Sequence, residues 1–283
     1  MKFPALAEKQ DLQGNALNAQ RFKMLSDIAE ELQKRIVFPI SFDLTIGIRN
    51  ALQKGLPDEH LRQLLRLDPL ICAKLLRDAT RKARRHKQTA VTDIERAIAF
   101  LDGDTIVKVA TEFSTAQLLR SRSLADYSEW ACLQWERTLS MAATAHVIAK
   151  KHTDIAPEQA MFAALCHDLS LYYMLYRAVK YPELRARPAS LKHLVINWHG
   201  GIAQSLLNSL ALPSEIIEAV SGEMWQLTQK PKTLGDIVQI SKILLDPPSE
   251  STSDSGYSTL EAHFRDDQSE IQAFRQVLYC LYS

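Results

Sequence analysis

The sequence of 283 residues holds few residues that break helices, since it contains only 9 glycines and 11 prolines. A β sandwich of this length would need many more turns rich in glycine and proline, so the scarcity favours long helices. The four cysteines, Cys72, Cys132, Cys166 and Cys280, lie far apart and form no CxxC motif. We therefore expect neither a disulfide framework nor a zinc site, and we expect a reducing compartment.

Long apolar runs and an excess of one charge are also missing. No apolar segment approaches the roughly 20 residues that a membrane-spanning helix needs. The first residues, MKFPALAEKQ, lack the apolar region of a signal peptide. We expect a cytoplasmic protein that does not contact a membrane. Lysine and arginine number 34 and aspartate and glutamate 33, which gives a net charge of +1. This balance excludes a surface wholly devoted to a polyanion, but it allows a local basic patch.

Nearly every segment repeats its apolar residues at the spacing of an amphipathic helix, and no strand-like alternation of useful length occurs. Thr92 and Glu95 have the spacing of a capping box, which predicts a helix start. Gly200 and Gly201 predict a break between two helices. The segment 246–258 is rich in proline, serine and aspartate, and predicts a linker. The predicted fold class is all-α.

A His–Asp pair, His167 and Asp168, stands inside an otherwise apolar helical segment. Burying an ionised carboxylate among apolar side chains is costly unless a cation or hydrogen bonds compensate it. Taken alone, the pair is either a buried contact that fixes helix geometry or part of a functional site.

The surroundings of this pair resemble the signature of the HD phosphohydrolase superfamily, and four segments resemble its HDOD branch in the family's order. The resemblance covers about residues 36–245. It implies a multi-helical HDOD/HD-like fold with an N-terminal helical half and an HD-like C-terminal half. It also implies a role in signalling or regulation, generally without phosphohydrolase activity. The segments are LDPLICAKLLRDA (67–79), VTDIERAIAFLDGDTIVKVA (91–110), MFAALCHDLSLYYML (161–175) and HGGIAQSLLNSLALPSEIIEAV (199–220).

The resemblance and the composition together predict four parts of the chain. An N-terminal helical extension occupies 1–35, and the N-terminal helical half of the HDOD domain occupies 36–125. The HD-like half occupies 126–246, and a linker with a C-terminal helix occupies 247–283. The polar segment RSRSLADY, at 120–127, marks the boundary between the two halves.

In the HD hydrolases that the sequence resembles, an early histidine, the His–Asp pair and a late aspartate hold a divalent metal. Arg137 stands at the position of the early histidine and Lys242 at that of the late aspartate. Arginine and lysine donate hydrogen bonds and do not normally bind metals. We therefore expect a degenerate HD pocket without metal, cofactor or catalytic residue, in which both cations pair with Asp168. His199 belongs to this pocket because it begins a family segment. If a metal does bind, its ligands are His167 and Asp168.

A basic run extends from residue 74 to residue 87. Lys74, Arg77, Arg81, Arg84 and Arg85 recur at helical spacing, so they are candidates to contact the phosphates of a nucleotide or nucleic acid. The alternative is a solvated face, or one matched to an acidic patch elsewhere on the chain. No aromatic residue interrupts the run, so a platform for base stacking is not indicated.

Aromatic residues gather in and around the HD-like half. They either line a pocket between the two helical halves or pack in the core and at its boundary. These residues are Trp130, Trp135, Tyr172, Tyr173, Tyr176 and Tyr181.

The sequence favours a non-catalytic regulatory or signal-transduction module that binds a small ligand or a protein partner near the degenerate HD pocket. The first alternative is a metal-dependent phosphohydrolase acting on nucleotides, which Arg137 and Lys242 argue against because hydrolysis needs the metal. The second alternative is a nucleic-acid-binding protein that uses the basic run. The sequence specifies neither the ligand, nor the partner, nor the oligomeric state.

Overall fold

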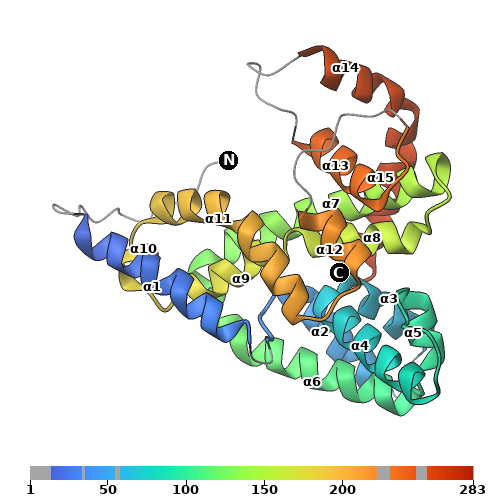
Figure 1. The fold of residues 1–283 in the computed structure, drawn as a ribbon, viewed down its shortest axis with the longest axis horizontal. Helices are drawn as coiled ribbons and strands as arrows, with labels where there is room; N and C mark the ends of the chain where they lie inside the picture. Colours follow the sequence, from blue (N-terminus) through green and yellow to red (C-terminus); the bar gives the residue numbers. More distant parts are fainter. Residues whose placement is uncertain (1–13, 34–35, 55–57, 222–229, 247–253, 283) are drawn as a thin grey trace.

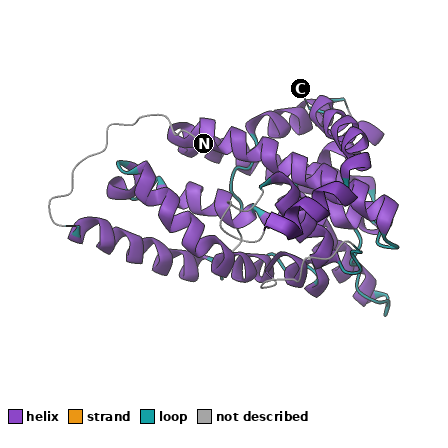
Figure 2. Ribbon diagram, turned by 90° about the horizontal axis from the view of Figure 1, so that it is seen from above, coloured by secondary structure: helices purple, strands orange, loops and turns teal. Residues whose placement is uncertain are grey.

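The computed structural model describes residues 14–33, 36–54, 58–221, 230–246 and 254–282. Within these ranges the chain forms fifteen α-helices, two short 3-10 helices and no strand. Figures 1 and 2 show how the helices are arranged. The all-α prediction is therefore confirmed. None of the described helices is long and apolar enough to cross a bilayer.

Five helices follow one another in the first half of the chain. Their starts carry side-chain caps: the carboxylates of Asp58, Asp68, Asp93 and Asp102 and the hydroxyl of Ser41 each accept a backbone N–H of the first turn. α2 packs against α3 and α6, and α4 packs against α5 and α6. The helices are α2 (Phe42–Gln53), α3 (Glu59–Leu67), α4 (Pro69–Arg85), α5 (Ile94–Phe100) and α6 (Gly103–Ser121).

The second half is organised around one long helix, α7 (Ser128–His152), which follows the 3-10 helix η1 (Arg122–Tyr127). Most of α7 from Thr138 to Ala149 is buried because neighbours cover it on several sides, chiefly α8 and α13. Many of these buried residues are alanine, serine or threonine, whose small side chains allow close helix packing. The other helices are α8 (Pro157–His167), α9 (Leu169–Ala178), α10 (Pro182–Arg185), α11 (Pro188–Ser209), α12 (Ser214–Ser221) and α13 (Leu234–Leu245).

The first and last described helices pack against this second half. Figure 1 shows α1 (Asn15–Glu31) beside α9 and α10, where Glu31 forms an ion pair with the buried Arg177. At the other end, α14 (Asp254–His263) and the 3-10 helix η2 (Arg265–Asp267) lead into α15 (Gln268–Cys280), which lies on α7.

The buried apolar residues form one continuous core that includes residues of every long helix from α1 to α15. The segment predicted as the boundary between the halves contains η1, whose Leu124 and Tyr127 are buried in that same core. The four-part division of the chain stays a prediction, because a shared core does not mark where one unit ends.

Three local expectations need correction. Gly200 and Gly201 do not interrupt a helix, because α11 runs through both. The two glycines are exposed, and their neighbours on the buried side of α11 hold it against the core. The cap of α5 is Asp93 and not Thr92. The predicted linker is partly helical, since α14 begins at residue 254, while residues 247–253 lie outside the described ranges.

Candidate functional site

Asp168 lies at a break between two helices. The sequence predicted that the His–Asp pair stands inside one apolar helical segment, but α8 ends at His167 and α9 begins at Leu169. The backbone of Asp168 has φ −94° and ψ 4°, a sparsely populated region in which many functional residues are found. The carboxylate is buried, with 5% of the side chain exposed.

Four side chains surround this carboxylate, three of them from α7. Oδ2 accepts hydrogen bonds from Nε2 of Gln134 at 2.7 Å, Nη1 of Arg137 at 3.0 Å and Oγ1 of Thr138 at 2.9 Å. Oδ1 lies 2.8 Å from Nδ1 of His167. We call Asp168 and these four partners the Asp168 cluster. Because Gln134, Arg137 and Thr138 fall on one face of α7, the cluster fixes the rotation of that helix over the α8–α9 break.

The charges in the cluster keep Asp168 ionised. Burial alone would raise its pKa, but the hydrogen bond and positive charge of His167, the Arg137 guanidinium and the Thr138 hydroxyl together hold the pKa of Asp168 well below its usual range. The Tyr172 hydroxyl lies 3.1 Å from Oγ1 of Thr138. Burial and the nearby negative charge of Asp168 raise the pKa of Tyr172 well above its usual value, so Tyr172 stays protonated.

Arg137 extends the cluster to a second carboxylate. Its Nη1 contacts Asp168, while its Nε donates to Oδ2 of Asp246 at 2.8 Å and its Nη2 also contacts that oxygen. Asp246 is the residue that directly follows α13. The guanidinium therefore ties α7 both to the α8–α9 break and to the end of α13.

The two other residues predicted for the HD pocket lie nearby without contacting the carboxylate. Lys242 forms no ion pair with Asp168 or with another residue in the described part of the chain, so the predicted pairing holds for Arg137 alone. Three other donors already contact Oδ2 of Asp168. The ring of His199 is 6.4 Å from that of His167. Burial lowers the pKa of His199, and the charges of His167, Lys242 and Arg137 lower it further.

The residues in this pocket do not fit a divalent metal. Both oxygens of Asp168 already bind protein donors, and the Arg137 guanidinium places a positive charge next to them. A metal would need several deprotonated oxygen, nitrogen or sulfur ligands at one point. Within the described ranges, no group of three or more histidine, cysteine, aspartate and glutamate side chains is arranged to hold an ion.

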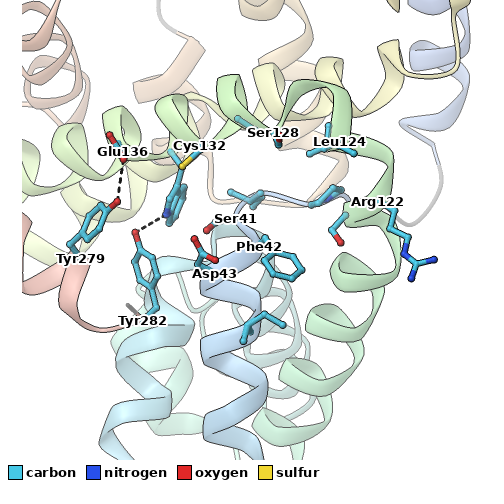
Figure 3. A pocket seen from close by; sticks show the side chains of 17 residues that line it. Ser41, Phe42, Asp43, Arg122, Leu124, Ser128, Cys132, Glu136, Tyr279 and Tyr282 are labelled. Atoms are coloured by element: carbon cyan, nitrogen blue, oxygen red, sulfur yellow. Dashed lines mark hydrogen bonds between the residues drawn. The ribbon is translucent and has the colours of Figure 1, made fainter. Parts of the chain in front are cut away.

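A different face of α7 lines a cavity of about 640 Å³, shown in Figure 3. Its walls come from α2, η1, α7 and the C-terminal segment, so it lies between the two halves. Two hydrogen bonds join α7 to the C-terminal segment in the cavity wall. The Tyr279 hydroxyl donates to Glu136 at 3.1 Å, and Nε1 of Trp135 donates to the Tyr282 hydroxyl at 3.0 Å. Volumes of about 300–1,000 Å³ are typical of small-molecule sites. We call it the interface cavity.

Of the aromatic residues that the sequence singled out, Trp135 lines the interface cavity, whereas Tyr172 and Tyr173 are fully buried in the core. Tyr279 and Tyr282 were missed because no local pattern indicates where the C-terminal helix packs. Gln134 and Thr138 were missed as partners in the Asp168 cluster, and Tyr172 and Asp246 as residues that contact it, because no local pattern indicates which helices meet at Asp168. One signal did exist, since Gln134 and Thr138 flank Arg137 at spacings that share a helix face.

The basic run divides into paired and unpaired residues. Nζ of Lys74 lies 2.6 Å from Asp78 on the same helix. The neighbouring Lys82 lies 3.6 Å from Asp102 and donates to the backbone oxygen of Phe100. The four arginines have no ion-pair partner in the described ranges, and all four line a second hollow. They are Arg77, Arg81, Arg84 and Arg85.

The comparisons with known proteins agree with this architecture. The HDOD domain family model matches residues 49–223. The MmoQ response regulator from Methylococcus capsulatus str. Bath is similar in structure, with a TM-score of 0.55 and 21% identity over 82% of this chain and 96% of that chain. A candidate metal-dependent phosphohydrolase from Shewanella amazonensis SB2B has a TM-score of 0.47 and 15% identity, over 94% and 100% of the chains. No curated protein matches the chain. The likeness to MmoQ shows the fold alone.

Proposed function

Because the chain belongs to the HDOD domain family, we propose that it is a regulatory module of signal transduction without phosphohydrolase activity. One observation carries this proposal: protein donors bind both oxygens of Asp168, and the Arg137 guanidinium is one of these donors. Hydrolysis in the HD superfamily depends on a metal that polarises phosphate and lowers the pKa of bound water. A guanidinium supplies positive charge, but it has no coordination position at which water or phosphate could be activated.

The interface cavity is the ligand site that we propose for this module. Its lining is largely apolar, with carboxylates at Asp43 and Glu136 and hydroxyls at Tyr279 and Tyr282. This chemistry fits a small amphipathic molecule that has an apolar body and a hydrogen-bonding or cationic group. The space around Asp168 suits a ligand less well, because protein donors already surround the carboxylate.

Helix α7 connects the cavity to the Asp168 cluster. Trp135 and Glu136 line the cavity, while the adjacent Gln134 and Arg137 hold Asp168. A ligand that shifts or rotates α7 at Trp135 must therefore either move Arg137 or strain its contacts. Arg137 in turn reaches Asp246 at the end of α13. We propose that ligand binding reaches partner proteins through this connection, with α13 and the C-terminal segment as the output.

The first test is metal analysis of the purified chain, with phosphatase and phosphodiesterase assays on the same sample in the presence of manganese. We expect no stoichiometric metal and no hydrolysis. Stoichiometric manganese, iron or zinc that is lost in His167→Ala, but retained in the exposed surface control His193→Ala, would overturn the proposal. Circular dichroism establishes that both variants are folded.

The second test addresses the cavity with N-phenyl-1-naphthylamine, an uncharged fluorescent probe that has an apolar body and one N–H donor. Ala131 lines the cavity, so Ala131→Phe should fill part of it and weaken probe binding by about tenfold, or 1.4 kcal/mol. Ala99→Phe adds the same ring to an exposed position on α5 and serves as the matched control. Equal probe binding by the parent protein and Ala131→Phe would place the ligand elsewhere.

A further inference from the structure

The four unpaired arginines form one wall of a groove of about 600 Å³, distinct from the interface cavity. They come from successive turns of α4, in the first half of the chain. The opposite wall is the turn between α11 and α12, where Ala211 has a left-handed backbone with φ 57° and is followed by Leu212 and Pro213. The groove therefore joins the two halves, and we call it the arginine groove.

The positive charge of this groove is not balanced within the described part of the chain. Asp78 and Asp102 form ion pairs with the neighbouring lysines, Lys74 and Lys82, and not with the four arginines. In addition, Nε of Arg77 is buried without a hydrogen-bond partner. Unpaired buried donors are uncommon because they lose their hydrogen bonds to water. The arrangement leaves charge and donors available for a bound anion.

Stabilisation of the C-terminal end of α4 explains only two of the four arginines in the arginine groove. Basic residues in the last turn of a helix interact favourably with the partial negative charge of its C-terminus. That effect accounts for Arg84 and Arg85, which lie in the last turn of α4. It does not account for Arg77 and Arg81, because it falls off within one turn.

We propose that the arginine groove binds a small anion that carries two or more phosphate groups. Guanidinium groups bind phosphate oxygens through paired hydrogen bonds. At a rise of 1.5 Å per residue, the row from Arg77 to Arg84 extends about 10 Å, which suits a short chain of phosphates. Val91, Leu212 and Pro213 add apolar surface for the rest of such a molecule.

A small ligand fits these observations better than a nucleic acid does. The row of arginines ends with α4 at Arg85, which limits the length of the groove. The α11–α12 turn encloses the groove on its other side. Among the described residues no aromatic side chain lines it, whereas proteins that bind single strands stack bases on aromatic rings. A ligand here would hold α4 against the α11–α12 turn. It would act independently of Asp168 and of the interface cavity.

Isothermal titration of the full chain with inorganic tripolyphosphate at low ionic strength tests the proposal. We expect the parent protein to bind and the double variant Arg77→Gln/Arg81→Gln to bind about tenfold more weakly, or worse. The control Arg62→Gln/Arg96→Gln removes the same charge at two positions that do not line the groove. We expect its affinity to stay within about twofold, since each 1.4 kcal/mol is a factor of ten.

Three results would overturn the proposal. The first is no binding of tripolyphosphate by the parent protein, and the second is an equal loss of affinity in the control. The third is tight binding of duplex DNA without binding of tripolyphosphate, which would identify a nucleic-acid surface instead. The double variant Arg84→Gln/Arg85→Gln repeats the test in the exposed last turn of α4. If Arg77→Gln/Arg81→Gln fails to fold, this second variant still decides the question.

Discussion

Replacing Arg137 by methionine tests the Asp168 cluster directly. The substitution removes the guanidinium while keeping an unbranched side chain that can fill much of the same space. It leaves Asp168 with the amide of Gln134, the hydroxyl of Thr138 and the ring of His167. The carboxylate then remains buried and hydrogen-bonded, but without the guanidinium.

The expected cost follows from the burial of the two partners. Side-chain exposure is 5% for Asp168 and 19% for Arg137, so solvent screens their interaction only partly. Removing one partner of a fully buried ion pair costs about 3–5 kcal/mol, and a hydrogen bond to a charged group contributes about 1.5–3 kcal/mol. Because three donors remain on Asp168, we expect Arg137→Met to lower the free energy of unfolding by about 2–3 kcal/mol.

Urea denaturation followed by circular dichroism measures this change. Asp246→Asn is the matched control, since it weakens only the outer arm of Arg137, at a carboxylate that is 56% exposed. Exposed ion pairs contribute about 0–1 kcal/mol, so the control should change little.

A double-mutant cycle of Arg137→Met with Asp168→Asn isolates the interaction between the two side chains. Residues in direct contact show coupling free energies of about 0.5–3 kcal/mol. A coupling near zero, or a loss of stability in Arg137→Met no larger than in Asp246→Asn, would refute the role that we assign to the guanidinium.

Three further predictions concern stability. The pKa of Asp168 lies below its unfolded value, so the stability it contributes is complete above about pH 4 and is lost as the pH falls towards the folded pKa. The unfolding free-energy difference between the parent protein and Asp168→Asn should therefore shrink as the pH falls below about 4. Asp68→Ala should cost about 2–3 kcal/mol in urea denaturation, because it removes the cap of α4 and a partner of Gln117. Gly47→Val should cost about 1–3 kcal/mol and alter tryptophan fluorescence, since a Cβ at Gly47 would lie 3.1 Å from Cβ of Tyr282.

Helix starts were predictable wherever a short-range pattern decides them. Thr233 is the N-cap of α13, and its hydroxyl and the Asp236 carboxylate form a complete capping box. The same reasoning chose Thr92 for α5 because Glu95 completes the motif, yet the neighbouring Asp93 caps the helix. Two adjacent residues can both serve as caps, so local chemistry predicts the helix but leaves its first residue open by one position.

The helix break at Asp168 and the continuous helix at Gly200 show where local patterns fail. The apolar run around Asp168 suits one long helix, but the carboxylate meets donors from α7, which lies more than 30 residues earlier in the sequence. Gly200 lies on the exposed side of α11, where a glycine costs only about 1 kcal/mol relative to alanine. Burial of the opposite side outweighs that cost. In both cases tertiary contacts decide the outcome.

The placement of Arg137 gives a physical basis for the non-catalytic role that we propose. A metal in an HD site would draw together ligands from separate helices, and the guanidinium does the same here by binding Asp168 and Asp246. A metal also offers an open position to water or phosphate, whereas a guanidinium has donors only. In the function that we propose, Arg137 therefore maintains the connection between α7, the α8–α9 break and α13 without supplying a Lewis acid. On that proposal, a helix held in this way passes on the occupancy of the interface cavity without turning over a substrate.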